Sequence, residues 1–187
     1  KPVWPAGREA EMNLLVGFRA VVDAPRQKKV VLRLAASTLY RARVNGSFLG
    51  HGPARGPHGY YRVDEWDLSE RLSAGQNVVA IEVAGYNCNS YYLLDQPSFL
   101  QAEIVAGDQG LASTAGSGAP FTATVLEQRV QKVQRYSFQR PFIEYYRLQP
   151  DSDRWLREPA AAGPVVECPV QPEKKLLPRH VPVPGFA

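Results

Sequence analysis

The sequence is poor in the residue types that form metal centres, redox motifs and membrane spans. It has two cysteines, one methionine and three histidines among 187 residues. Cys88 and Cys168 lie far apart, in no Cys-x-x-Cys pair and with no histidine at metal-ligand spacing, so we predict no metal centre and no cofactor. Whether these two thiols form a disulfide stays open. No apolar run approaches the roughly 18 residues that cross a bilayer, and we expect no membrane partner.

Clusters of basic residues are also missing, although the formal net charge is +4. Acidic residues are interleaved with the lysines and arginines, which is typical of a solvated outer sheet face. We therefore predict no nucleic-acid partner. The chain opens with Lys1 rather than methionine, so we expect a trimmed start, and the lack of a leader peptide indicates nothing about the compartment.

What the sequence does contain is a succession of short segments with the period-two alternation of β-strands. Val30, Leu32 and Leu34, for example, fall on one face of such a strand. Asn45-Gly46 separates two of these segments and favours a two-residue type I′ hairpin turn, because that turn needs a positive φ at both central residues. The predicted strands are Met12–Val22, Val30–Ala35, Leu39–Val44, Ser47–Leu49, Asn77–Val83, Leu100–Val105, Phe121–Val125 and Phe142–Leu148.

Helical patterns are few. Asp67–Leu72 fits one short turn, and residues 126–134 fit either a short helix or a bent strand. Residues 107–120 are rich in small residues and are predicted as a loop. Many short strands without alternating helices predict an all-β fold, an antiparallel two-sheet sandwich of the jelly-roll kind.

The end of the chain differs in composition from the rest. From residue 159 onward there are seven prolines in 29 residues, and proline neither donates to a sheet ladder nor continues a helix. We therefore divide the chain into a sandwich domain at 1–158 and a Pro-rich linker or strap at 159–187. A linker in this position leads us to expect that a further domain follows it in the parent protein.

A Gly-rich stretch at residues 50–59 invites comparison with a phosphate-binding loop. It lacks the Lys-Ser/Thr end of such a loop, and Pro53 and Pro57 remove backbone donors that would hold a phosphate. A rigid loop that leaves the hairpin is the better interpretation. His51 and His58 have no third ligand nearby in the sequence, so we predict no metal there.

Carboxylates at Asp64, Glu65 and Asp67 are close in sequence, and glycosidases use carboxylate pairs. Such a pair must flank a sugar across a pocket, whereas adjacent residues on a strand point to opposite faces. We therefore predict surface or turn acids here. No Gly-x-Ser-x-Gly motif accompanies the serines, and we assign no catalytic residue.

Aromatic residues supply the candidate binding site. One group follows the Gly-rich stretch and another follows residues 77–83, so loops at one end of a sandwich would gather both. A flat ring stacks on the apolar face of a pyranose, while amides bind its hydroxyls. The alternative is that several of these rings cap the core. The candidate carbohydrate-binding residues are Tyr60, Tyr61, Trp66, Tyr86, Asn87 and Tyr91.

Residues 44–83 carry a recognisable combination: an Asn-Gly hairpin, then Gly-x-Gly-Pro, a tyrosine, and Asp-x-x-Asp-Leu before NVVAIEV. This combination resembles the N-terminal region of bacterial α-L-rhamnosidases of glycoside hydrolase family 78. Residues 129–148 and 176–184 are also similar to stretches that precede later domains of such enzymes. The resemblance implies a galactose-binding-like β-sandwich. In that family the acid and base residues lie in a separate (α/α)6 barrel, which nothing in this chain matches.

Two functions follow from these observations. The first is a non-catalytic accessory domain of a larger glycoside hydrolase, which binds a rhamnose- or galactose-containing glycan. The second is a structural domain that packs on the catalytic barrel of the same polypeptide without binding sugar, and this requires an exposed apolar patch, which we expect near the Pro-rich tail. An independent enzyme is a distant third, and a secreted or periplasmic location is favoured over a cytoplasmic one.

Overall fold

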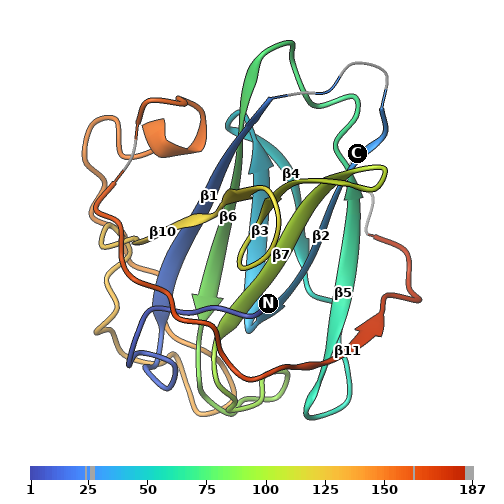
Figure 1. Ribbon diagram of the computed structural model, residues 1–187. Coiled ribbons are helices and arrows are strands. Elements are labelled where there is room, and N and C mark those ends of the chain that lie inside the picture. Colours follow the sequence, from blue (N-terminus) through green and yellow to red (C-terminus); the bar gives the residue numbers. More distant parts are fainter. Residues whose placement is uncertain (24, 26–27, 162, 184–187) are drawn as a thin grey trace.

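The computed structural model describes residues 1–23, 25, 28–161 and 163–183, in which two sheets pack face to face (Figure 1). One sheet has the order β10-β1-β6-β3-β4 and the other the order β11-β5-β2-β7-β8-β9. Neighbouring strands are antiparallel except for the parallel pairs β11–β5 and β8–β9. The predicted all-β, two-sheet sandwich is confirmed. The elements are β1 (Leu14–Asp23), β2 (Val30–Ser37), β3 (Leu39–Val44), β4 (Ser47–Gly52), β5 (Tyr60–Asp67), β6 (Gln76–Gly85), β7 (Phe99–Ala106), β8 (Gln109–Ser113), β9 (Ala119–Pro120), β10 (Thr122–Val125), the 3-10 helix η1 (Arg154–Leu156) and β11 (Lys175–Pro178).

One hydrophobic core fills the space between the sheets. The inward residues of the strands predicted from their alternation, such as Phe18, Leu32 and Ile81, are fully buried in it. Trp4, which precedes the first strand, is also fully buried and lies with its ring centroid 5.9 Å from that of Phe18. The alternation of the sequence therefore identifies the core faces of most strands correctly.

The predicted hairpin turn is confirmed. Asn45 has φ of 50° and Gly46 has φ of 81°, and Val44 pairs with Ser47 across the turn. The Asn45 side chain adds a second function, because its amide donates to Asn77 Oδ1 at 2.8 Å and its carbonyl accepts from the Val78 amide at 2.9 Å. This turn thus also fixes the start of β6.

Strand β5 was not predicted, and it corrects the interpretation of the acids. Asp64 and Glu65 do point to opposite faces, but Asp64 is fully buried, whereas Glu65 is exposed and pairs with Arg33 at 2.9 Å. Asp67, the last residue of β5, is exposed, and its carboxylate accepts hydrogen bonds from the backbone amide and the hydroxyl of Ser69. A charge at an inward position interrupts the apolar alternation, which is why the pattern missed the strand.

The buried carboxylate of Asp64 has three side chains around it. Tyr40 of β3 donates its hydroxyl to one carboxylate oxygen, and the Trp66 indole donates to that same hydroxyl at 2.9 Å. Arg179, which follows β11, donates to the other carboxylate oxygen at 2.9 Å. Because Tyr40 and Asp64 belong to different sheets, this cluster connects the two sheets and the C-terminal segment. We call these four residues the Asp64 cluster.

The Gly-rich stretch makes room for the Asp64 cluster. Gly50 and Gly52 lie in β4, and a Cβ atom on Gly50 would overlap the Trp66 ring, while one on Gly52 would overlap Asp64 and Tyr40. The rigid loop predicted at 50–59 therefore begins only after Gly52. The need for these two glycines is steric and has no connection with phosphate binding.

The C-terminal segment runs along the sandwich rather than away from it (Figure 1, red). The amide of Val166 donates to the Ala123 carbonyl at 2.9 Å, and Val170 forms a bridge with Val3. Strand β11 then pairs with residues 60–63 of β5. Residues 162 and 184–187 of the predicted linker lie outside the described residues.

The prediction of a loop at residues 107–120 is wrong. β8 pairs with β7, and β9 pairs with β8, so much of this segment extends the sheet. Small residues allow the close approach, since a Cβ on Gly118 would lie 2.5 Å from the Leu111 backbone. Backbone hydrogen bonds between β7, β8 and β9 hold this part of the sheet together. Its side chains do not alternate between apolar and polar, so the sequence gives little indication of strands here.

The predicted strand at 142–148 and the helical alternative at 126–134 are also wrong. Residues 129–148, which we call the arm, fold back on themselves with only two isolated bridges, Arg129 to Tyr146 and Arg135 to Phe142. In the second half Ile143, Tyr145 and Leu148 are exposed, whereas Phe142 packs against the small cluster of Tyr86, Cys88 and Leu93. The arm and the residues that follow it run along β10 and β1 (Figure 1, yellow to orange).

Membrane partners and metal centres were predicted to be absent, and the pairing of the two cysteines was left open. In the part of the chain that the structure describes, no helix is long and apolar enough to cross a membrane. The same residues contain no group of three or more His, Cys, Asp and Glu side chains placed to hold a metal. Cys88 and Cys168 are both free thiols, and burial raises the pKa of Cys168 to about 11.

Replacing Gly46 by valine should lower the free energy of unfolding by more than about 1 kcal/mol, since a β-branched residue resists a positive φ. A Cβ there would also lie 3.2 Å from Cβ of Arg157. Gly59→Val is the matched control, because Gly59 has φ of 79° but no atom within 4 Å of its Cβ position. Urea unfolding should give a larger loss for Gly46→Val, and equal or negligible losses would contradict the packing of residue 157 on the turn.

Stability should fall at alkaline pH because of Tyr40. Burial, and next the charge of Asp64, raise the pKa of the Tyr40 hydroxyl far above its ordinary value of 10.0. As the pH rises, the unfolded chain therefore loses this proton at a lower pH than the folded chain does. Above pH ~10, Tyr40 then lowers the free energy of unfolding by about 1.4 kcal/mol per pH unit. Chemical unfolding between pH 8 and 11 should show a shallower decline for Tyr40→Phe. Tyr136→Phe, at a site 76% exposed, should leave the decline unchanged, and an equal effect of both variants would contradict the assignment.

Candidate functional site

A groove with a volume of about 270 Å³ is lined by residues at the start of β5 and in the loop that follows β6. The start of β5 and the end of β6 lie at the same end of the sandwich (Figure 1, bottom). The loop before β5 forms one wall and the loop after β6 forms the other. The polar and aromatic lining of the groove comes from Thr38, Arg55, Tyr60, Tyr61, Arg62, Ser90, Tyr91, Tyr92 and Gln96. The expectation that loops from these two regions share one rim is met by this groove.

Three of the six candidate residues, Tyr60, Tyr61 and Tyr91, line the groove. Tyr60 is 41% exposed and Tyr91 75% exposed, so a ligand can reach both rings. Tyr61 is half-buried, its ring edge-on to Phe99 with centroids 4.6 Å apart, and burial raises the pKa of its hydroxyl. Tyr60 and Tyr61 lie on strand β5 rather than on a loop, which fixes their positions more firmly than we predicted.

Tyr60 and Tyr91 each have a neighbour that restricts the side chain. The Lys175 ammonium lies 5.4 Å from the centroid of the Tyr60 ring, within the range of a cation–π contact. The hydroxyl of Tyr91 accepts a hydrogen bond from the side-chain amide of Gln139 at 2.6 Å, and the Tyr91 amide donates to the Gln139 carbonyl. Strand β11 therefore supports one side of the groove, and the arm supports the other.

The other three candidates, Trp66, Tyr86 and Asn87, do not reach the groove. All three are buried, and Trp66 belongs to the Asp64 cluster. Tyr86 lies under Arg129, whose guanidinium carbon is 5.2 Å from the ring centroid. The alternative that some rings cap the core applies to Trp66 and Tyr86, and the six-residue patch is reduced to three tyrosines.

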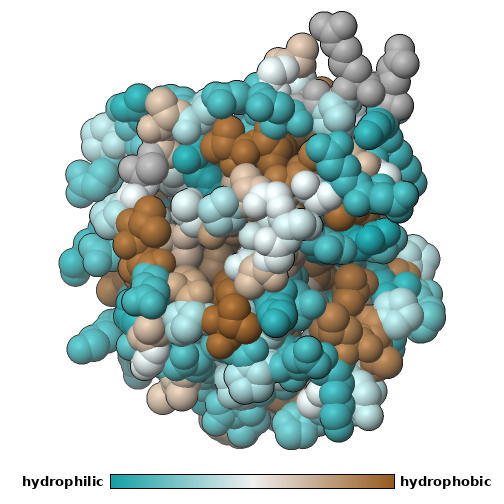
Figure 2. All heavy atoms as spheres, viewed as in Figure 1, coloured by the Kyte–Doolittle hydropathy of each residue, from teal (hydrophilic) through white to brown (hydrophobic). Residues whose placement is uncertain are grey.

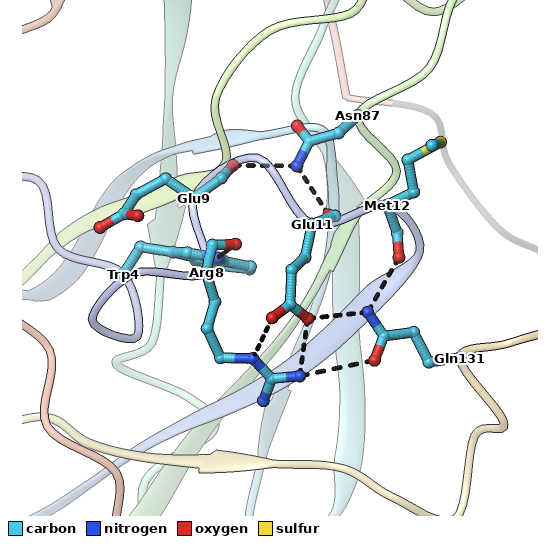
Figure 3. A network of polar contacts seen from close by, with 7 residues as sticks. All are labelled: Trp4, Arg8, Glu9, Glu11, Met12, Asn87 and Gln131. Carbon is cyan, nitrogen blue, oxygen red and sulfur yellow. Dashed lines mark hydrogen bonds and ion pairs between the residues drawn. The ribbon is translucent and has the colours of Figure 1, made fainter.

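Asn87 holds the groove wall from behind. Its side-chain amide donates to the carbonyls of Glu9 and Glu11 at 2.9 and 2.8 Å, and its φ is 42° (Figure 3). Arg8 forms an ion pair with Glu11 at 2.7 Å, and this bond lowers the pKa of the Glu11 carboxyl. The loop that leaves β6 is therefore fixed to the N-terminal loop.

Gln131 extends this network to the arm. Its amide donates to the Glu11 carboxylate and to the Met12 carbonyl, both at 3.0 Å (Figure 3). Asn13, at the start of β1, donates to the Gln131 carbonyl at 2.8 Å. Three segments that are remote in sequence thus meet behind the groove, and no local pattern predicts their contact.

The groove has cationic and amide groups but no carboxylate among its lining residues. Arg62 donates to the Pro178 carbonyl at 2.9 Å and to the Arg55 carbonyl at 3.3 Å, so it joins the loop, β5 and the C-terminal segment. The candidate set from the sequence analysis lacked Arg55, Arg62, Ser90, Tyr92 and Gln96, all of which line the groove. Arg62 lies two residues after Tyr60, so recognising β5 as a strand was the signal that would have placed it on the same face as Tyr60.

Exposed apolar side chains gather on the arm. Within it Tyr136, Phe138, Ile143, Tyr145 and Leu148 are between 46% and 76% exposed. Such a concentration in one short segment exceeds the scattered exposure that is normal for a protein surface. On the face drawn in Figure 2, hydrophobic side chains form several patches separated by hydrophilic ones. The arm thus carries exposed apolar side chains of the kind that the structural-domain hypothesis requires, but in residues 129–148 rather than in the Pro-rich tail.

Comparison with known proteins gives similarity in structure only. No protein-family model matches the chain, and no curated protein matches it. The family 78 rhamnosidase of Bacillus sp. GL1 is similar over 97% of this chain and 20% of its own, with 25% identity and a TM-score of 0.83. The α-L-rhamnosidase of Aspergillus terreus matches 84% of this chain and 22% of its own, with 15% identity and a TM-score of 0.50.

The resemblance to family 78 rhamnosidases that the motifs indicated is confirmed by the Bacillus structure. The chain spans about a fifth of the length of these two rhamnosidases. This share is consistent with a single domain of a larger glycoside hydrolase.

Proposed function

We propose that this chain is a non-catalytic accessory domain of an α-L-rhamnosidase-like glycoside hydrolase and that its groove binds carbohydrate. The observation that carries the binding function is the groove itself, where Tyr60, Tyr61 and Tyr91 meet beside two arginines and an amide. Rings of this kind stack on the C–H face of a pyranose, and the polar groups bind its hydroxyls. A rhamnose- or galactose-containing glycan is the ligand class that fits the similarity to rhamnosidases.

The affinity expected of such a groove is low. It is open and shallow enough to leave most of Tyr91 exposed, so one sugar unit gains a stacking contact and a few hydrogen bonds that compete with water. A dissociation constant near 1 mM, or about 4 kcal/mol, is the scale we expect. Accessory domains of enzymes that act on polymers gain from repeated weak contacts, which raise the effective concentration of substrate.

The arm favours a second function, attachment to the catalytic domain of the same polypeptide. Its exposed apolar residues, Tyr136 and Phe138 above all, would be covered by a neighbouring domain. Inter-domain interfaces of this sort bury roughly 600–1,500 Å². Binding of sugar at the groove and docking through the arm use different residues, so the two functions are separable by mutation.

The groove proposal is tested by matched tyrosine variants. Tyr91→Ala removes a groove ring that is 75% exposed, and Tyr136→Ala removes an arm ring that is 76% exposed. In titrations with L-rhamnose and D-galactose followed by amide NMR, the parent chain and Tyr136→Ala should show shifts at residues 53–62 and 90–96. Tyr91→Ala should bind at least about tenfold more weakly, a loss of roughly 1.4 kcal/mol.

Shifts confined to another face, or the absence of shifts at tens of millimolar sugar, would leave only the docking function. Tyr91→Ala and Tyr136→Ala with equal affinities would also contradict the groove proposal.

The chain alone should not hydrolyse aryl α-L-rhamnosides. Glycoside hydrolysis needs two carboxylates across a sugar, one of them protonated. Glu82 and Glu144 line one further cavity together, but Glu82 pairs with Arg43 at 3.5 Å and Glu144 with Arg41 at 4.0 Å. Release of p-nitrophenol by the purified chain should equal that of buffer. Turnover that Glu144→Gln or Glu82→Gln abolishes would overturn the non-catalytic assignment.

A further inference from the structure

A second cavity, of about 590 Å³, lies on the outer face of the β10-β1-β6-β3-β4 sheet. Strands β1 and β10 form its floor, and residues from 147–155 and 163–166 form much of its cover. Its volume falls within the 300–1,000 Å³ typical of small-molecule sites. It shares no lining residue with the tyrosine groove, so the two are separate sites.

Arg19 of β1 lines this cavity and is 8% exposed. One guanidinium nitrogen donates to the Glu158 carbonyl, but the buried Nε has no hydrogen-bond partner. Among the described residues, no carboxylate lies within ion-pair distance of Arg19. A buried cation without an anion is costly, and buried charges in proteins are therefore paired. This unpaired guanidinium points to an anionic group that enters the cavity.

The cavity also has an aromatic wall. Trp155 of η1 lies over Gly17, where a Cβ atom would be only 2.7 Å from Cη2 of the indole. The absence of a side chain at Gly17 lets the indole approach the sheet two residues from Arg19. Val125 and Val166 add apolar surface. An indole beside a guanidinium suits a ring that has one apolar face and one negative substituent.

The net charge of the lining favours an anion as well. Arg8 and Arg147 line the cavity with Arg19, against a single acid, Glu127. Arg8 is already paired with Glu11. Arg147 is exposed and makes no ion pair with a carboxylate of the described residues. A charged ligand would therefore meet a positive potential at the cavity and a second guanidinium beyond Arg19.

We propose that this cavity binds a carboxylated sugar, a uronic acid unit, with its carboxylate on Arg19 and its ring against Trp155. A planar guanidinium recognises a carboxylate with directed hydrogen bonds, which a neutral sugar cannot replace. This site does not depend on the tyrosine groove. The groove is proposed to bind neutral sugars, and the cavity would allow the same accessory domain to bind acidic sugars as well.

The test compares three small molecules on the full chain. The probes are sodium D-galacturonate, neutral D-galactose and sodium acetate, each followed through the Trp155 indole N–H and the amides of Gly17 and Thr124. Trp155→Phe identifies the indole signal among the three that the chain can give. Galacturonate should shift these signals with a dissociation constant near 1 mM, while galactose binds at least tenfold more weakly.

Arginine variants separate recognition from folding. Arg19→Gln should abolish the galacturonate shifts, and Arg147→Gln, at an exposed site, should weaken binding at least threefold without unfolding the chain. Arg140→Gln is the control, since Arg140 is also exposed and does not line the cavity.

Equal shifts with galactose and galacturonate, equal affinity for acetate, or no shifts at about 50 mM of any probe would overturn the proposal. Equal affinities of the Arg147→Gln and Arg140→Gln variants for galacturonate would also overturn it. These measurements follow Trp155 and the effect of Arg147, neither of which lines the groove. Their outcome therefore does not depend on whether the groove binds neutral sugar.

Discussion

The carboxylate of Asp64, which has no access to solvent, is the constraint on which the rest of the fold depends. It lies on β5, accepts a hydrogen bond from Tyr40 of the opposite sheet and pairs with Arg179 of the C-terminal segment. A buried carboxylate is stable only if such partners are present. The cluster therefore sets the distance between the sheets at this edge and requires the C-terminal segment to return to the sandwich.

The geometry of the groove depends on the Asp64 cluster. Arg179 anchors the end of β11, and β11 pairs with β5 so that Lys175 stands opposite Tyr60 and Leu176 opposite Tyr61. The first two tyrosines of the site are thus held by the C-terminal segment. The third, Tyr91, is held from the other side by Gln139 of the arm. A binding surface built from loops and tails becomes rigid because each part is fixed to the buried core.

Features that depend on residues close in the sequence could be predicted, and features that depend on remote residues could not. The Asn45-Gly46 turn and the alternating strands are local, and they were predicted correctly. Strand β5 was missed because its inward Asp64 is neutralised by Arg179, 115 positions away. For the same reason Asn87, whose partners are the carbonyls of Glu9 and Glu11, was placed in the site although it supports the site from behind. Composition identified aromatic residues near the groove but could not tell Tyr91, on the surface, from Trp66, in the core.

A double-mutant cycle on Asp64 and Arg179 tests this account most directly. Arg179→Met should lower the free energy of unfolding by about 3–5 kcal/mol, since it leaves a buried carboxylate without its cation. Asp64→Asn keeps an acceptor for Tyr40, and adding it to Arg179→Met should restore part of the stability, so that the double variant is more stable than Arg179→Met alone. A double variant that is less stable by the sum of the two single losses would show that the residues act independently, and the Asp64 cluster would then not be what holds the C-terminal segment to the sandwich.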